Sequence, residues 1–506
     1  MSKITKQDVV DWANKYLGPE SYAIIYKREG KDPDEQKIAA PKITPIVTNR
    51  DSQSEFLSEI QTSQVQPIEP VFVDYKKDMS QFEAQPGIDV LYKKNETNDI
   101  FTLIYVFNTG TENDPALNLA FNYLSYLGTD KMTAEEIASE MYDIACSFYM
   151  NAGANQSSIQ ITGLSENMGK AMEIVEGLIA GAKPDEAILE NCKADMLKSR
   201  ADAKLNQSRC FGALQRYLFY GGDFIRRTTL TDPALQALTS EQLLAKIGDL
   251  TGKQHEVLYY GPQKEAEVKS ALAKHHKVAA DLQPLEKKFS ALLPTDANKV
   301  VLAQYDAKQL YYLQFSNRGE KFDVAADPEI TLYNEYFGGG MNTIVFQEMR
   351  EARGLAYTAW ATLATPSNAN GDYSYYAFIA TQNDKMQKAA EAFDDIINNM
   401  PESEKAFGIA KEALVSRLRT ERTVKDGVLW SYLRARDLGL DAPRDKQIFE
   451  KVQSMTLDDV KAAQQKWVKG RKYVYGILGD IQDLDLNYLK TLGPIQTVSQ
   501  EEIFGY

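Results

Sequence analysis

Residues 238–260 read LTSEQLLAKIGDLTGKQHEVLYY and place a helix signal directly before a strand signal. Thr239, followed three residues later by Gln242, has the pattern of an N-cap with its capping-box partner. An apolar spacing typical of an amphipathic helix comes next, and a run rich in Tyr, Val and Leu then predicts a strand. The stretch therefore predicts a helix that leads through a turn into a β-strand.

The same pattern occurs twice more in the chain. Residues 4–26 read ITKQDVVDWANKYLGPESYAIIY, and residues 455–477 read MTLDDVKAAQQKWVKGRKYVYGI. Each copy opens with an apolar residue and a threonine, and an aspartate stands three residues after that threonine. A predicted strand begins about 17 or 18 residues after each threonine. The chain therefore contains three copies of one helix-and-strand ending.

A second repeat lies ahead of two of these endings. KADMLKSR begins at Lys193 and KEALVSRL begins at Lys411, and the distance to the threonine of the following ending is 46 residues in one case and 45 in the other. Each unit also opens with two predicted strands. We therefore predict an α+β fold with two homologous domains, residues 71–264 and 297–506, each a mostly antiparallel sheet with helices packed on it.

The copy at residues 4–26 has no such unit in front of it. We therefore expect residues 1–30 to be the tail of a preceding homologous domain, so that the chain starts inside a longer arrangement. Residues 31–70 are rich in Pro, Gln, Ser and charged residues, and they are expected to form an extended linker. Residues 265–296 are expected to be a shorter linker between the two domains.

The composition narrows the class of partner. Of the 506 residues, 43% are hydrophobic and 25% are charged, which is typical of a globular domain protein. The net charge is −14 and no long basic run offsets it, so no nucleic-acid partner is predicted. No run of 18 or more apolar residues occurs, so no membrane span is predicted.

The sequence lacks the residues of a catalytic centre. Only three histidines are present, and no H-x-x-E-H, H-E-x-x-H or H-x-x-x-H motif occurs. His275 and His276 are neighbours that would point about 100° apart on a helix, so we expect both on a solvated surface. His255 is interpreted as structural. Three cysteines without a C-x-x-C motif are interpreted as plain thiols: Cys146, Cys192 and Cys210. We therefore expect no metal in this chain.

The stretch MREARGLAY, residues 349–357, suggests a binding function instead. Arg350 is expected to end an amphipathic helix and Tyr357 to open a strand seven residues later. Two strong hydrogen-bond donors at such a turn could hold a substrate, although each residue alone is more typical of a solvated helix face or a strand. Glu348 and Arg353 are expected to orient the turn or to face solvent. Three tyrosines further on are expected to pack in the sheet: Tyr373, Tyr375 and Tyr376.

Residues 336–361, YFGGGMNTIVFQEMREARGLAYTAWA, resemble the C-terminal domain signature of the pitrilysin, insulysin and mitochondrial processing peptidase family. Active members of this family are inverted-motif zinc peptidases, with zinc held by the two histidines of H-x-x-E-H and a distant Glu. By this resemblance, the zinc-motif region of the family corresponds to residues 119–129 of this chain, LAFNYLSYLGT. Phe121, Leu124 and Ser125 then stand at the key positions of the motif. None of the three can replace a histidine ligand or the catalytic base, so the zinc motif of the first domain is degenerate.

The resemblance also implies a role for the Arg and Tyr pair. Large family members have four domains in two bowl-shaped halves, and the half without zinc lends an arginine and a tyrosine, seven residues apart, across the chamber. Arg350 and Tyr357 match this spacing and are the expected substrate-binding residues, with no catalytic residue in this chain alone. By this resemblance the pair should lie together on the concave face, open to solvent and unpaired with any local carboxylate.

The resemblance thus implies the C-terminal, metal-free half of a zinc metallopeptidase, inactive alone. Its expected partners are a zinc-bearing N-terminal half or catalytic subunit, which would hold the zinc cofactor, and a peptide or unfolded polypeptide substrate. Two alternatives stay open. The chain could be a zinc-free scaffold or partner subunit, or a module that binds extended peptides by β-strand addition without catalysis.

Overall fold

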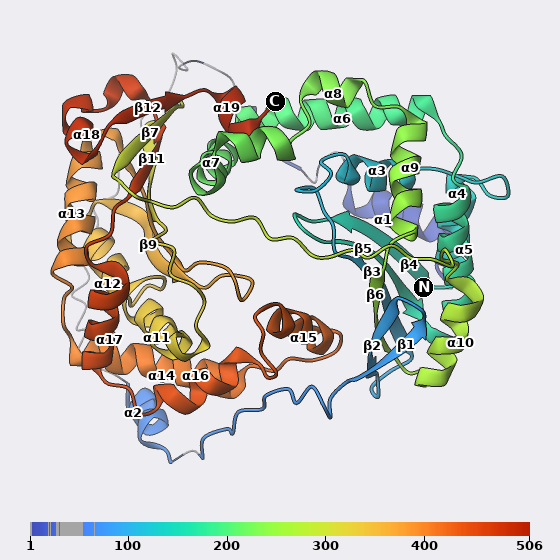
Figure 1. Ribbon diagram of the computed structural model, residues 1–506, viewed down its shortest axis with the longest axis horizontal. Coiled ribbons are helices and arrows are strands. Elements are labelled where there is room, and N and C mark those ends of the chain that lie inside the picture. Colours follow the sequence, from blue (N-terminus) through green and yellow to red (C-terminus); the bar gives the residue numbers. More distant parts are fainter. Residues whose placement is uncertain (1–2, 19, 21, 27–29, 31–53, 65) are drawn as a thin grey trace. The chain divides into compact units, whose positions relative to one another are not determined.

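The computed structural model describes residues 3–18, 20, 22–26, 30, 54–64 and 66–506 (Figure 1). Contacts divide the chain into two compact units, Met1–Pro67 and Ile68–Tyr506. The first unit carries helices α1 (Lys6–Tyr16) and α2 (Glu55–Thr62). The second unit carries two six-stranded sheets and the other helices of the described residues.

The first sheet has the strand order β1-β2-β6-β3-β5-β4. Its strands are β1 (Ser80–Gln85), β2 (Ile88–Lys94), β3 (Ile100–Phe107), β4 (Cys146–Ala152), β5 (Ser157–Leu164) and β6 (His255–Gly261). Its helices are α3 (Leu117–Leu124), α4 (Ala134–Asp143), α5 (Met168–Gly181), α6 (Glu186–Lys204), α7 (Gln207–Thr228), α8 (Asp232–Gln236), α9 (Ser240–Thr251) and α10 (Glu265–His275).

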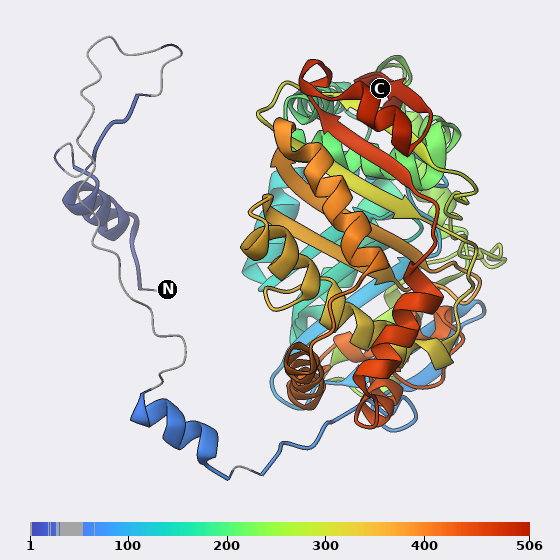
Figure 2. The ribbon, with the colours of Figure 1, turned by 90° about the vertical axis from the view of Figure 1, so that its left-hand side faces the viewer.

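The second sheet has the order β12-β7-β11-β8-β10-β9. Its strands are β7 (Lys299–Gln304), β8 (Gln309–Ser316), β9 (Ala356–Ala364), β10 (Ser374–Gln382), β11 (Val474–Gly479) and β12 (Ile495–Val498). Its helices are α11 (Asp327–Phe337), α12 (Ile344–Phe346), α13 (Met386–Asn398), α14 (Glu404–Thr420), α15 (Gly427–Asp437), α16 (Arg444–Val452), α17 (Leu457–Ala463), α18 (Leu486–Leu492) and α19 (Gln500–Phe504). Figure 2 shows helices of this domain in front of its strands.

The predicted fold class is confirmed, because both domains are α+β and most strand pairs in each sheet are antiparallel. The strand of each repeated ending has the same central position. Strand β6 runs parallel to β2 and antiparallel to β3, and β11 runs parallel to β7 and antiparallel to β8. The two sheets differ at one edge, where β1 pairs antiparallel with β2 but β12 pairs parallel with β7.

The two repeated lysines make the same contact in both domains. The Nζ atom of Lys193 donates to the carbonyl oxygen of Gln236 at 3.0 Å, and the Nζ atom of Lys411 donates to that of Gln453 at 2.8 Å. Each acceptor lies three residues before the threonine of its ending. The matched contacts show that the similar sequence spacings, 46 and 45 residues, reflect equivalent positions in the two domains.

A buried tyrosine also has a counterpart in each domain. The hydroxyl of Tyr123 in α3 accepts from the backbone N–H of Asp185 at 2.7 Å, and that residue caps the N-terminus of α6. The hydroxyl of Tyr336 in α11 accepts from the backbone N–H of Ser403 at 3.1 Å, and Ser403 caps α14. Helices α3 and α11 are therefore equivalent, and each fixes the N-terminus of a long helix later in its domain, α6 or α14.

Each sheet is covered on one face by a helix from the other domain, as Figure 1 shows for α7 and α15. Helix α15 packs on the first sheet through Val428, Leu429 and Leu433, which contact Leu91, Ile104 and Leu258. Helix α7 packs on the second sheet through Cys210, Leu214 and Leu218, which contact Val301, Leu313 and Leu478. A Cβ atom at Gly476 would lie 2.2 Å from Leu218 Cδ1, so the glycine lets α7 approach β11 closely.

An ion pair strengthens the contact between α15 and the first sheet. The guanidinium of Arg436 donates to both carboxylate oxygens of Glu256 in β6, at 2.5 and 2.7 Å. The hydrogen bond to Glu256 raises the pKa of Arg436 above its ordinary value. Because Glu256 is buried, this bidentate contact gives both of its carboxylate oxygens a hydrogen-bond partner.

The structure corrects three expectations about the connecting segments. Residues 22–26 form no strand, whereas the sequence repeat predicted one there. A strand needs a neighbour to satisfy its backbone groups, and no strand of the described residues pairs with this stretch. Helix α2 lies within the predicted 31–70 linker, of which residues 31–53 and 65 fall outside the described residues. Helix α10 opens the predicted 265–296 linker, because Val268 and Leu272 pack into the first core.

Candidate functional site

Arg350 and Tyr357 lie at the junction between a short helix and an edge strand of the second sheet. Helix α12 continues into a π-helical turn, Gln347–Ala352, and Tyr357 is the second residue of β9. The helix starts only at Ile344, and Met341 ahead of it is exposed. The turn contains the glycine Gly354 with a φ of +56°, a value that a side chain would strain.

The glycine-rich segment before α12 anchors the start of the site. A Cβ atom at Gly338 would lie 2.1 Å from the carbonyl oxygen of Ala361, so only glycine permits this approach to β9. The backbone N–H of Ala361 then donates to the carbonyl oxygen of Gly338 at 2.9 Å. The segment is therefore a helix-to-helix turn that holds α11 against β9.

The side chains of Arg350 and Tyr357 are in contact. The guanidinium carbon of Arg350 lies 4.4 Å from the ring centroid of Tyr357 and 4.9 Å from that of Phe346. Nη1 of Arg350 also donates to the carbonyl oxygen of Tyr357 at 3.3 Å. The arginine is thus held between two aromatic rings, which attract its charge through their electron-rich faces.

Both side chains also reach solvent. Tyr357 is 75% exposed, and the Arg350 side chain keeps 34% of its accessible surface. Among the described residues, no hydrogen bond reaches the Tyr357 hydroxyl. The pair therefore presents a phenolic O–H and part of a guanidinium, and both groups are donors that suit a carbonyl or a carboxylate.

The expectation that Arg350 is unpaired with a local carboxylate is wrong. Its Nε atom lies 3.3 Å from Oε1 of Glu351. Adjacent residues on an α-helix point about 100° apart, but these two long side chains meet where the helix widens into the π-helical turn. Since both partners are substantially exposed, such a pair contributes only about 0–1 kcal/mol.

Glu348 and Arg353 hold the turn in place. Arg353 lies 3.4 Å from Glu348 and 2.6 Å from Asp395 of α13. The hydrogen bond to Asp395 raises the pKa of Arg353, and the same bond lowers the pKa of Asp395. This arginine therefore connects the π-helical turn to α13, as expected for a residue that orients the turn.

The three tyrosines after β9 mainly serve the core, as predicted. Tyr373 and Tyr375 are fully buried, and the Tyr373 hydroxyl donates to the carbonyl oxygen of Asp323 at 2.9 Å. Tyr376 is half-buried and contacts Trp360.

The degenerate zinc-motif positions lie on α3 and do not fit a metal. Phe121 and Leu124 are buried in the first core and carry no donor atom. Ser125 is exposed, and its hydroxyl donates to the carbonyl oxygen of Asn122 at 2.7 Å. Within the described ranges, no group of three or more His, Cys, Asp or Glu side chains could hold a metal ion.

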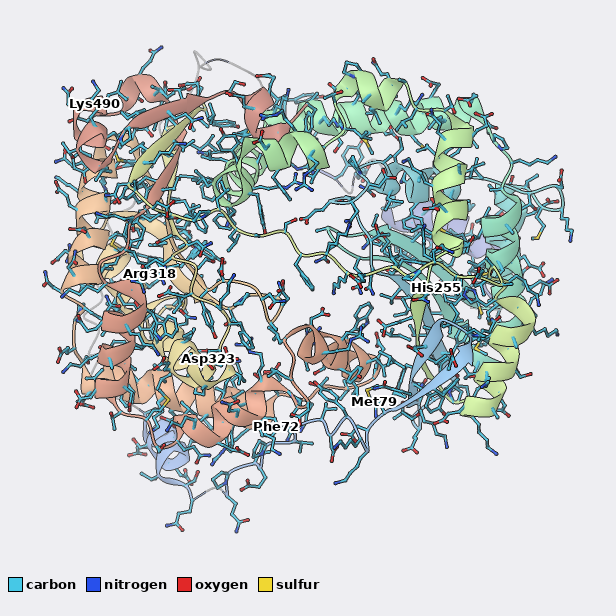
Figure 3. The ribbon with its side chains drawn as sticks, viewed as in Figure 1. Phe72, Met79, His255, Arg318, Asp323 and Lys490 are labelled. Carbon is cyan, nitrogen blue, oxygen red and sulfur yellow. The ribbon has the colours of Figure 1, made fainter. Side chains whose placement is uncertain are left out.

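The histidines correct a further expectation. His276 is not on a solvated surface, because only 4% of it is exposed. Its Nε2 atom lies 2.8 Å from Nε2 of His255, and its Nδ1 atom lies 2.6 Å from Glu176. His255 also contacts the carbonyl oxygen of Lys253 through Nδ1 at 2.8 Å. We refer to His255, His276 and Glu176 as the buried histidine cluster; Figure 3 shows His255 in the first sheet.

The contact with the Lys253 carbonyl oxygen fixes the tautomer of neutral His255. Nδ1 of His255 must carry hydrogen to donate to a carbonyl, so its Nε2 atom accepts from His276. Burial, with a smaller contribution from His276, lowers the pKa of His255 from 6.5 to about 4. No local sequence pattern indicates this cluster, because Glu176 lies 100 residues from His276.

The cysteines are plain thiols, as predicted. All three are buried and none forms a disulfide. Burial raises the pKa of each thiol above its ordinary value, which disfavours the nucleophilic thiolate. In the part of the chain that the structure describes, no helix is both long and apolar enough to cross a membrane.

The chain is similar to known proteins in both sequence and structure. Residues 250–414 match a sequence family described as the peptidase M16 inactive domain. An uncharacterized zinc protease of Rickettsia bellii is 24% identical over 309 residues, which cover 59% of this chain and 70% of that protein. The crystal structure of a peptidase M16 inactive domain from Pseudomonas fluorescens has a TM-score of 0.63 at 18% identity, over 79% of this chain and 98% of that one. The periplasmic protease PqqL of Escherichia coli has a TM-score of 0.61 at 12% identity, and the match covers 94% of this chain but only 51% of PqqL.

Proposed function

We propose, from the premise that this chain is a protein of the M16 peptidase family, that it is the metal-free half of a zinc peptidase. In this proposal Arg350 and Tyr357 contact the scissile carbonyl of a peptide held against a zinc-bearing half. The observation that carries the proposal is the contact between the two side chains, with the Tyr357 ring 4.4 Å from the guanidinium and 75% of the tyrosine exposed. A structural pair would bury its donors, whereas this one presents them.

The division of labour follows from the residues present. The metal of the reaction would belong to the other half, because α3 of this chain offers Phe121 and Leu124 where a ligand is needed. The contribution of this chain is to bind the peptide and to polarise the carbonyl. A hydroxyl and a guanidinium aimed at a developing oxyanion stabilise it more than the ground-state carbonyl, and one such donor is typically worth about 10²–10³ in rate.

The ion pair with Glu351 does not prevent this role. A carbonyl that acquires negative charge competes with Glu351 for the guanidinium, and an exposed pair costs only about 0–1 kcal/mol to break. The contacts of the Arg350 guanidinium with the rings of Phe346 and Tyr357 meanwhile keep it close to the Tyr357 hydroxyl. Arg350 can therefore change partner without leaving its place.

Peptide binding by β-strand addition is less well supported. Strand β9 is an edge strand, but its outer edge is already capped by its own chain. The N–H of Leu363 donates to Oδ1 of Asn334 at 2.9 Å, and its carbonyl oxygen accepts from Nδ2 of the same residue at 2.9 Å. Together with the bonds from Ala361 to Gly338 and from Arg350 to the carbonyl oxygen of Tyr357, these contacts occupy backbone groups near both ends of β9 that an added strand would need.

The test is kinetic and requires the zinc-bearing half. In the reconstituted enzyme, Tyr357→Phe should lower kcat by about 10- to 10³-fold with little change in KM, because the hydroxyl acts mainly in the transition state. Arg350→Ala should lower kcat/KM by a similar factor. Tyr149→Phe is the matched control, since Tyr149 is a 65% exposed tyrosine on β4, the edge strand of the first sheet. Unchanged turnover in both site variants would favour the scaffold role instead.

A further inference from the structure

We propose that Thr381 is a positioning residue for the candidate site, because its buried hydroxyl holds the turn from which the side chain of Tyr357 is aimed. This role rests on the function proposed above, since a residue positions Tyr357 for a reaction only if the tyrosine takes part in it. Thr381 itself does not reach a substrate, because only 1% of it is exposed.

Tyr357 is the extra residue of a β-bulge. In the pairing of β9 with β10, Ala356 lies opposite Thr381. The next pair joins Thr358 and Ala380, so Tyr357 is an additional residue in β9. A bulge displaces such a residue from the regular alternation of the strand and thereby changes the direction of its side chain. The 75% exposed phenol is the side chain that is redirected here.

The helix before the turn is irregular as well. Arg350 lies in the π-helical turn Gln347–Ala352. A π-helical turn closes its hydrogen bonds over one residue more than an α-helix does, and such turns are frequent at functional sites. Both members of the pair are therefore carried by backbone that a regular helix followed by a regular strand would not provide.

The backbone of Leu355 connects the two irregular segments. Its N–H donates to the carbonyl oxygen of Met349 in the π-helical turn at 2.9 Å. Its carbonyl oxygen accepts from Oγ1 of Thr381 at 2.6 Å. Thr381 therefore ties to β10 the residue that lies between the turn of Arg350 and the bulge of Tyr357.

The bond from Thr381 is the buried one among the contacts that hold this turn. Nζ of Lys385 donates to the carbonyl oxygen of Gly354 at 3.2 Å, and Arg353 lies 2.6 Å from Asp395. Both of these contacts reach solvent, so water can replace a lost partner. The bond from Thr381 is buried, and its loss leaves a carbonyl oxygen that water cannot reach.

The first sheet has a glycine and a regular pairing at the equivalent place. Gly163 is the second-last residue of β5 and pairs with Cys146, the first residue of β4. In the same way Thr381 is the second-last residue of β10 and pairs with Ala356, the first residue of β9. A Cβ atom at Gly163 would lie 2.5 Å from the carbonyl oxygen of the residue before Cys146, and β4 pairs with β5 in unbroken register over its whole length. The threonine and the bulge therefore occur together, at the sheet edge that carries the candidate site.

The experiment compares substitutions of Thr381 in the enzyme reconstituted with the zinc-bearing half. Thr381→Val keeps the shape of the side chain and removes the hydroxyl. It should lower kcat by about 10- to 100-fold and change KM by less than about threefold, since a misplacement of about 1 Å can cost about 10²-fold. Thr381→Ser keeps the hydroxyl and should restore kcat to within about fivefold of the parent.

Thr162→Val is the matched control. Thr162 of β5 also donates from Oγ1 to a carbonyl oxygen of the adjacent strand, that of Phe101 at 2.8 Å. Its removal should leave kcat unchanged, because this bond lies in the first sheet. An equal loss of kcat in Thr162→Val and Thr381→Val would show a general effect on the fold and would overturn the positioning role.

The coupling between Thr381 and Tyr357 provides a second test. If Thr381 acts through the phenol, Thr381→Val added to Tyr357→Phe should lower kcat by less than about threefold more. Two independent losses would multiply instead, and a multiplied loss in the double variant would contradict the proposal.

A measurement on the chain alone tells failure of this role from failure of the proposed function. A meta-fluorinated tyrosine placed at position 357 alone gives one fluorine NMR resonance. Arg350→Ala should shift it, because the guanidinium lies 4.4 Å from the ring. Thr381→Val should shift it too, whereas Thr381→Ser and Thr162→Val should not. A resonance that Thr381→Val leaves in place would overturn the positioning role. A shifted resonance with unchanged turnover in Tyr357→Phe would place the failure in the proposed function, and the positioning role would fall with it.

Discussion

The first and second sheets share one backbone plan but place their polar groups at different depths. In the first domain, His255 at the start of β6 and His276 at the end of α10 form a buried pair, which contacts the partly buried Glu176 of α5. In the second sheet Arg350 and Tyr357 lie exposed at the start of β9, on an edge. Buried polar groups are fixed by the fold and affect its stability, whereas exposed donors are available to another molecule. One duplicated scaffold can thus keep its core and change its function by changing which strand carries the polar groups.

The largest expected difference between the two sheets is in their response to acid. His255 has a folded-state pKa of about 4, below its ordinary 6.5, because burial disfavours its charged form. Its contribution to stability is therefore complete above pH 6.5 and is lost as the pH falls from 6.5 toward 4. Between these two pH values the unfolded chain binds a proton at this histidine and the folded chain does not. The loss is on the order of 3 kcal/mol.

Urea unfolding at pH 7 and pH 5 measures this effect, and His255→Gln should reduce the difference between the two midpoints. Hydrogen exchange, corrected for the intrinsic effect of pH, should show loss of protection in β3 and β6 but not in β8 and β11. The second domain contains no histidine, so it provides the internal control. Equal loss in both sheets would show that carboxylates, and not the buried histidine cluster, control the acid response.

The repeated lysines offer a smaller contrast. Lys193→Met removes charge-assisted hydrogen bonds from a side chain that is 6% exposed, and we expect a loss of about 1.5–3 kcal/mol. Lys411→Met removes the equivalent bonds from a more exposed site where water can replace them, so its effect should be smaller. Chemical denaturation of the two variants measures the loss of unfolding free energy in each. A larger effect at Lys411 would contradict the assignment of burial as the cause.

The smallest contrast concerns the two capping tyrosines. Tyr123→Phe and Tyr336→Phe each remove a hydroxyl that holds the start of a helix, and a typical hydrogen bond contributes about 0.5–1.5 kcal/mol. The Tyr123 hydroxyl also donates to Ser240 Oγ at 2.8 Å, and the Tyr336 hydroxyl donates to the carbonyl oxygen of Pro401 at 2.7 Å. Tyr123→Phe should cost more, because Ser240 is fully buried and water cannot replace the lost bond there. Thermal unfolding of the two single variants would rank them, and Tyr126→Phe, at an exposed tyrosine, is the control.

The extent to which the sequence predicted the molecule depended on how local each feature is. The capping boxes at Thr239 and Thr456, the central strands and the equivalence of the lysines all follow from short patterns that repeat. The buried histidine cluster could not be predicted, because it joins three elements that are adjacent only after the sheet and its helices pack. The edge strand β12 was missed for a different reason, because its four residues are too few to carry a periodic signal.

The candidate site was predicted in position but not in detail. The spacing of Arg350 and Tyr357 across a helix-to-strand turn placed them together, and they are in contact. The pairing of Arg350 with Glu351 was not foreseen, because the prediction assumed a regular helix and the chain forms a π-helical turn there. The widening of one helical turn is too subtle for apolar periodicity to show.

The exchange of helices α7 and α15 between the two sheets has a consequence for how the protein is made. The last residue of the first sheet and its helices, His275, leaves the ribosome about 160 residues before the end of α15, which covers that sheet. At a synthesis rate of about 5–20 residues per second, the apolar face that includes Leu91, Ile104 and Leu258 stays uncovered for roughly 10–30 s. A nascent chain in that state presents a surface that molecular chaperones bind, so the first domain is the part of this protein whose biogenesis should depend on them.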